Sequence, residues 1–216
     1  MSFLKSYLKK EEDLPDLIQN FWQWFTKHEQ QFFKIIKEGT EIHEKFFSKL
    51  GPRLKHIDEG IFYLVGLHDK YTAELIFTAE GDVEKVFFVE ELVSKAPVLN
   101  GWRFTALKPK TRHTRVATSH YEFTNDNIDF YDKFEEAYPD EINIVLTHTK
   151  LNETNEETLS TGIYLFLDNL LGELELISLI DDVQFITKER GEKKWIPITK
   201  LNDYLTWRQK EFVEKY

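Results

Sequence analysis

The sequence predicts an α+β protein with an antiparallel or mixed sheet of about six strands, N-terminal helices and a C-terminal helix. Three observations lead to this fold class. Apolar residues recur every three or four positions between residues 14 and 57, as they do along a buried helix face. Short apolar segments bounded by turn residues occur between residues 60 and 190, as in strands. A last helical pattern covers residues 199–216.

The length and composition allow one compact domain or two small ones. The chain has 216 residues, of which 41% are hydrophobic and 15% aromatic, enough to bury a full core. We expect a single domain over residues 1–216. It would consist of a helical N-terminal part (14–57), a sheet-containing part (60–190) and a C-terminal helix (199–216).

Two helices are expected in the N-terminal part. Pro15 suits the first turn of a helix, where its missing N–H costs nothing. An aromatic-rich apolar face follows, which predicts a core or dimer element: it comprises Leu17, Phe21, Trp24, Phe25, Phe32, Ile35 and Ile36. Gly39 should end this helix, and the pair at 51–52 (Gly-Pro) should kink or split the second one.

The pattern of apolar and turn residues in the sheet-containing part predicts two units, each in the order strand, strand, helix, strand. In the first unit we expect strands at 61–67 and 73–78, a helix opened at Asp82, and a strand at 102–107. In the second we expect strands at 121–123 and 142–148, a helix ended by Gly172, and a strand at 174–180 that 183–187 would continue. The residues of the two units do not match.

Composition restricts the compartment and the partners. The chain has no Cys, which excludes disulfides and cysteine nucleophiles and fits a reducing cytosol. A formal charge of −10 disfavours nonspecific binding to nucleic acid. No apolar run approaches the ~20 residues of a membrane span, and residues 1–10 lack the apolar core of a signal peptide. We therefore expect a cytoplasmic protein without a membrane span or a nucleic-acid partner.

Sequence motifs of common enzymes and metal sites are absent. No glycine-rich loop has the spacing that binds phosphates, and no nucleophile elbow occurs. His28-Glu29 and His43-Glu44 resemble the start of a zinc-protease motif, but Phe32 and Phe47 stand where its second histidine is required. We expect no metal and no cofactor.

Two clusters are candidate site residues. One is a basic stretch in an otherwise acidic chain, suited to an anion or an acidic partner because Arg binds such groups with paired hydrogen bonds; it comprises Arg103, Lys108, Lys110, Arg112, His113 and Arg115. A solvated loop is the alternative. The other cluster would supply an acid or base if the protein is an enzyme: Glu173, Asp181 and His148.

Two segments resemble signatures of an uncharacterised bacterial family of domains of unknown function. Residues 96–106 read Ala-Pro-Val-Leu-Asn-Gly-Trp-Arg-Phe-Thr-Ala, and residues 167–173 read Leu-Asp-Asn-Leu-Leu-Gly-Glu. Members of that family typically begin with a Trp- and Phe-rich helix, which residues 21–25 resemble. The resemblance would therefore cover residues 15–190. It implies a bacterial cytosolic protein and implies no activity.

Three functions remain as hypotheses. The first is a protein-interaction or regulatory module, including an immunity protein that blocks a toxin, which needs no catalytic residues. The second is an enzyme of unfamiliar type acting on an anionic substrate. The third is a structural homo-oligomer assembled through the aromatic helices. We favour the first, with a protein partner or self-association through aromatic faces. A cleft that joins Arg103, Arg112 and Glu173 would favour the enzyme instead.

Overall fold

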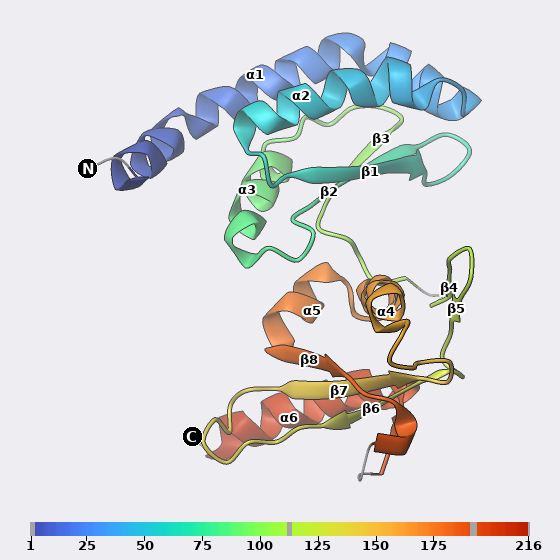
Figure 1. Cartoon of the computed structure of the whole chain (residues 1–216). Coiled ribbons are helices and arrows are strands. Elements are labelled where there is room, and N and C mark those ends of the chain that lie inside the picture. Colours follow the sequence, from blue (N-terminus) through green and yellow to red (C-terminus); the bar gives the residue numbers. More distant parts are fainter. Residues whose placement is uncertain (1–2, 112–113, 191–193, 216) are drawn as a thin grey trace. The chain divides into compact units, whose positions relative to one another are not determined.

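The computed structural model describes residues 3–111, 114–190 and 194–215; the side chains of residues 3–12, 190 and 211–215 are not described (Figure 1). The α+β class is confirmed. The chain divides into two compact units, Met1–Lys108 and Pro109–Tyr216. Each unit has its own hydrophobic cluster, although the sequence favoured one domain. We therefore describe the units separately.

Three helical segments open the N-terminal unit: α1 (Phe3–Glu38), the π-helical turn η1 (His43–Phe47) and α2 (Ser48–Ile57). Helix α1 runs through Pro15 instead of starting there. Burial of Leu14 and Ile18 on either side offsets the hydrogen bond that proline removes. The second helix is irregular at η1, where the Ser48 N–H reaches the His43 carbonyl, and not at Pro52, which lies inside α2.

The sheet of the N-terminal unit has three strands in the order β1-β2-β3. These are β1 (Phe62–Leu67), β2 (Ala73–Thr78) and β3 (Trp102–Ala106), with helix α3 (Val83–Ser94) between β2 and β3. β1 pairs antiparallel with β2, and β2 pairs parallel with β3. Helix α3 begins as expected at Asp82, whose carboxylate accepts a hydrogen bond from the Glu84 N–H at 3.0 Å.

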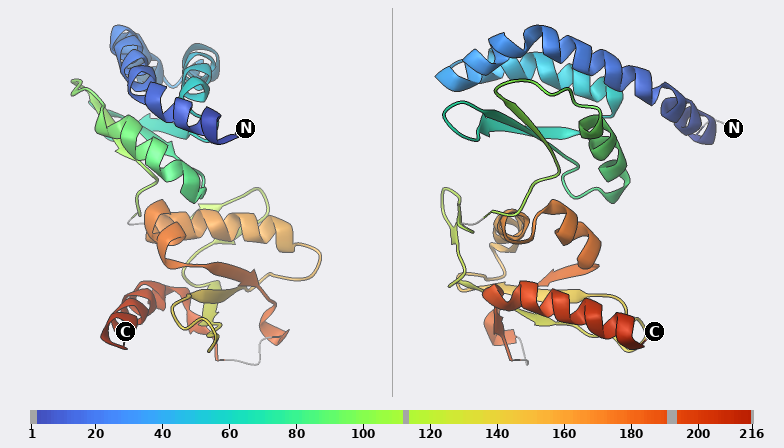
Figure 2. Two further views of the ribbon diagram at one scale, coloured as in Figure 1. Left: turned by 90° about the vertical axis from the view of Figure 1, so that its left-hand side faces the viewer. Right: turned by 180° about the vertical axis from the view of Figure 1, so that it is seen from behind.

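Figure 2 shows α1 and α2 side by side on one side of this sheet. The aromatic residues of α1 pack on the sheet: the Phe25 and Trp102 rings are 4.9 Å apart, and the Trp22 indole N–H donates to the Leu92 carbonyl at 2.8 Å. Gly101 places Trp102 there with a φ of +83°, which favours glycine. The aromatic face of α1 therefore forms a large cluster inside the core, which leaves little of it for self-association.

The C-terminal unit holds two further sheets. A small antiparallel pair comprises β4 (Val116–Ala117) and β5 (Glu122–Phe123), and a four-stranded sheet has the order β8-β7-β6-β9. Its strands are β6 (Ile128–Asp132), β7 (Asn143–His148), β8 (Asp182–Phe185) and β9 (Ile196–Pro197). The helices are α4 (Glu156–Leu171), α5 (Glu173–Leu179) and α6 (Leu201–Lys215), with short turns η2 (Lys188–Arg190) and η3 (Ile198–Lys200). As in the N-terminal unit, an antiparallel pair (β6 and β7) is followed by a helical connection to a parallel strand (β8).

Three expectations need correction. The described residues form sheets of three, two and four strands, not one sheet of about six. Residues 174–179 belong to helix α5 instead of a strand, because Leu176 and Leu179 reach the core at helical spacing, and Ile180 follows the helix in an extended conformation. Within residues 121–123, β5 pairs only with β4. The first strand of the larger sheet along the chain is β6, which the sequence analysis did not predict because Asp129 and Asp132 interrupt its apolar pattern.

Candidate functional site

A groove between α1 and α3 is the largest hollow that we identify in the N-terminal unit, with a volume of about 1060 Å³. Leu14, Ile18 and Trp22 recur at every fourth position, so they form one row along α1. Helix α3 contributes Phe87 and Glu91, which are also four residues apart. The two helices thus present facing rows, and the floor of the groove is apolar.

The rim of this groove combines an exposed aromatic ring with unpaired charge. Phe87, a large apolar side chain, is 52% exposed. Lys27 and Lys95 also line the groove, and neither forms an ion pair within the described part of the chain. Glu91 is the one acidic side chain among the lining residues that we describe. The groove therefore suits an apolar ligand that carries negative charge at its edge.

The candidate cations of the basic stretch are distributed over both units. Arg112 and His113 lie outside the described residues. Each of the other four has a carboxylate partner: Arg103 Nε lies 3.0 Å from Glu74 Oε1, Lys108 Nζ 3.4 Å from Glu80 Oε2, Lys110 Nζ 3.7 Å from Glu175 Oε1, and Arg115 Nε 2.6 Å from Glu122 Oε1. Anion binding by the basic stretch stays a prediction. Its electrostatic support is smaller than the sequence suggested, because neighbouring carboxylates already balance the charge of these four cations.

His148, a candidate acid or base, is buried at the end of β7 with both ring nitrogens in use. Its Nδ1 accepts a hydrogen bond from the Lys150 N–H at 3.1 Å, so Nε2 carries the proton and donates to the Glu122 carbonyl at 3.0 Å. Burial is the main cause that lowers the pKa of His148 below its usual 6.5. The ring joins β7 to β5, which gives it a structural role.

Asp181 and Glu173 are likewise held by the fold. Asp181 Oδ2 accepts from the Ile142 N–H at 2.7 Å, and the Asp181 N–H donates to the Ile142 carbonyl at 3.0 Å. Ile142 precedes β7 and His148 ends it, so Asp181 and His148 lie about 20 Å apart along the strand. Asp181 and His148 therefore do not form an acid–base pair. Glu173 is fully buried at the start of α5.

The sequence analysis missed the groove between α1 and α3. Its signal was present in Leu14, Ile18 and Trp22, a second apolar row beside the expected aromatic face of α1. Within the described residues, no three His, Asp or Glu side chains are grouped to hold a metal ion, and no helix is both long and apolar enough to cross a membrane.

We compared the chain with protein-family models, with curated proteins and with solved structures, and none of them matches. The resemblance to the bacterial family therefore stays a prediction. Any function has to be argued from the geometry of the chain itself.

Proposed function

We propose that this chain is a protein-interaction module that binds an amphipathic helix of a partner protein in the groove between α1 and α3. The observation that carries the proposal is the half-exposed Phe87 beside a hollow whose floor is the nearly buried apolar row of Leu14, Ile18 and Trp22. Exposed apolar surface that is continuous with an apolar hollow marks sites where proteins associate. We propose that such binding serves a regulatory role, for example that of an immunity protein that blocks a toxin.

The dimensions of the groove support a helix as its occupant. Leu14 and Trp22 are eight residues apart, so the row extends for about 12 Å, or about two helical turns. A partner helix with apolar residues at every third or fourth position would lie along this nearly buried floor and make its main apolar contact with Phe87 at the rim. Lys27 and Lys95 at the rim favour acidic side chains beside the apolar face of that helix.

Site-specific photo-crosslinking in the native cells tests this function. A benzophenone amino acid replaces Gln19, which lines the groove, or Gln30, an exposed residue of α1 that does not line it. We expect a partner protein to be cross-linked from position 19 and not from position 30. Adding Phe87→Gln should lower the yield at position 19, because it removes apolar contact from the rim.

Two results would contradict the proposal. Equal cross-linking from positions 19 and 30 would mean that the groove is not the binding surface. Cross-linking of position 19 only to a second copy of this chain would favour the homo-oligomer instead.

A further inference from the structure

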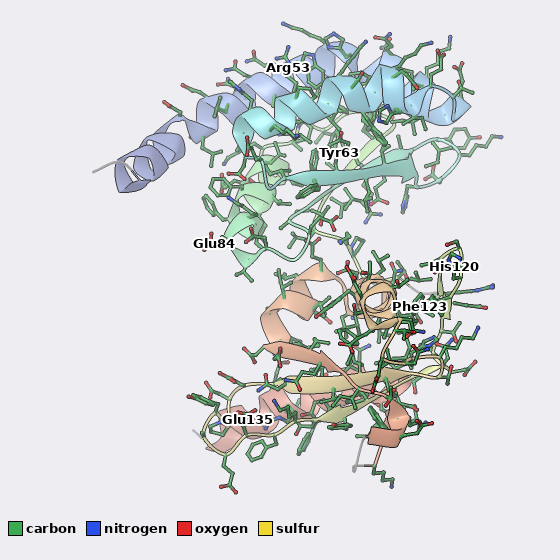
Figure 3. All side chains as sticks on the ribbon, in the orientation of Figure 1. Arg53, Tyr63, Glu84, His120, Phe123 and Glu135 are labelled. Carbon is green, nitrogen blue, oxygen red and sulfur yellow. The ribbon has the colours of Figure 1, made fainter. Side chains whose placement is uncertain are left out.

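A second groove of about 690 Å³ lies on the other flank of α1, between α1 and α2. Phe21, Trp24 and Pro52 provide apolar surface, Lys27 and Arg53 provide positive charge, and His56 adds an imidazole ring. Figure 3 labels Arg53 on the helical side of the N-terminal unit. Three basic side chains thus line one hollow that is also partly aromatic.

The lining of this groove is positive although the chain as a whole is acidic. Several basic side chains elsewhere pair with acids, as Lys85 does with Asp58 at 3.2 Å and Arg103 with Glu74 at 3.0 Å. Within the described part of the chain, Lys27, Arg53 and His56 have no such partner, and no carboxylate is among the described residues that line the groove. Helix α2 itself contains no Asp or Glu. The groove is therefore a local positive site that an anion would neutralise.

Arg53 is held in place before any ligand arrives. Its guanidinium carbon lies 5.1 Å from the centre of the Trp24 ring, within the range of a cation–π contact. A guanidinium that lies over a ring by its face keeps its N–H edge for paired hydrogen bonds to an anion. The side-chain amides of Asn20 and Gln23 also line the groove and can donate.

We propose that this groove binds a small organic phosphate, with its phosphate group on Arg53, His56 and Lys27 and its apolar part against Trp24 and Pro52. A phosphate monoester carries about −1.5 to −2 charges and three acceptor oxygens. It therefore matches the cations Lys27 and Arg53 and the imidazole of His56 better than a carboxylate does, because a carboxylate has one charge and two oxygens. The apolar wall favours an organic phosphate over inorganic phosphate.

Calorimetric titration of the full chain tests this assignment with phenyl phosphate, inorganic phosphate and benzoate at matched ionic strength. The Trp24 indole N–H resonance reports binding at the groove. We expect phenyl phosphate to bind more tightly than inorganic phosphate and to shift that resonance, whereas benzoate should bind much more weakly. The difference from benzoate isolates the phosphate group, and the difference from inorganic phosphate isolates the apolar contact.

Two double variants localise the site. Arg53→Gln/His56→Gln should weaken phenyl phosphate binding about tenfold or more, because charge-assisted hydrogen bonds are lost. His43→Gln/Lys49→Gln removes a histidine and a cation from η1 and α2 outside the groove and should leave binding unchanged. Arg53→Lys should also weaken binding, because it keeps the charge and removes the planar paired donors.

Four outcomes would overturn the assignment. The first three are equal weakening in both double variants, benzoate binding as tightly as phenyl phosphate, and no binding of phenyl phosphate. The fourth is that a single-stranded oligonucleotide shifts the Trp24 resonance and binds more tightly than phenyl phosphate, with a steep salt dependence. That result would assign the groove to nucleic acid. Gln23 and Lys27 line both grooves, but these variants change neither of them nor Phe87. The result is therefore independent of the proposed protein partner.

Discussion

At the scale of single residues, His148 shows how burial converts a titratable group into a structural one. The side chain is 2% exposed and lies between the Glu122 carbonyl and the Lys150 N–H. Burial lowers its pKa most, the Lys150 charge lowers it further, and the hydrogen bond to the Glu122 carbonyl opposes both. The neutral ring is therefore the form that the fold stabilises.

This lowered pKa predicts a pH dependence of stability. Below about pH 6.5 the unfolded chain gains a proton at His148 that the folded chain does not take up until a lower pH. The contribution of His148 is thus fully present above its unfolded pKa and decreases as the pH falls toward its folded pKa. We expect the parent to be more stable than His148→Gln at pH 7.5, and this difference in unfolding free energy to shrink as the pH is lowered.

Urea denaturation of both proteins at a series of pH values between 7.5 and 5 measures this difference. Comparison with the variant removes the contribution of carboxylates that titrate in both proteins. A difference that stays constant over this range would show that the pKa of His148 is not lowered by folding.

At the scale of elements, helix α4 packs on the short strand β5 through a glycine. A Cβ atom added at Gly162 would lie 2.1 Å from Cζ of Phe123, which is labelled in Figure 3. Phe123 is fully buried, so its ring has little room to move. The close contact of α4 with β5 therefore depends on the absence of a side chain at position 162.

Gly162→Ala should destabilise the fold by about 1–3 kcal/mol, as overpacking of a core does. Gly66→Ala is the matched control, because no atom lies within 4 Å of its added Cβ. We expect that control to remain within about 0.5 kcal/mol of the parent. Thermal unfolding of the two variants measures both values, and similar melting temperatures would exclude the tight packing at Phe123.

At the scale of the whole molecule, the two hydrophobic clusters share no residue. Leu146→Ala truncates a fully buried side chain of the C-terminal unit and should cost about 2–5 kcal/mol. We expect faster hydrogen exchange at amides of residues 114–190 and unchanged exchange at those of residues 14–107. Leu75→Ala, in the core of the N-terminal unit, should give the opposite pattern. Equal loss of protection in both units would indicate one cooperative domain, as the sequence analysis expected.

Local patterns were sufficient for much of the fold. The spacing of apolar residues predicted the buried face of α1, Asp82 predicted the start of α3, and Gly172 predicted the end of α4. The order strand, strand, helix, strand in the N-terminal unit was also correct. Residues 174–180 were misassigned because alternating Glu and Leu satisfy the strand period, whereas the contacts that select a helix involve residues far along the chain.

The candidate sites depended far more on tertiary structure. Arg103 looked unpaired in the sequence, yet parallel pairing of β2 with β3 places it in register with Glu74, 29 positions earlier. Both grooves require α1 to meet a helix distant in sequence, α3 in one case and α2 in the other. The absence of acid in residues 48–57 was the one local sign of the basic groove.

The sequence by itself determined which segments become helices or strands in most of the chain, because those choices depend on the period of nearby side chains and on caps within a few residues. The tertiary structure alone decided that the strands form separate sheets, which cations are neutralised and where the grooves lie. These features depend on which faces of the helices and strands pack together when elements far apart in the sequence come into contact. The pattern of neighbouring residues does not specify those contacts.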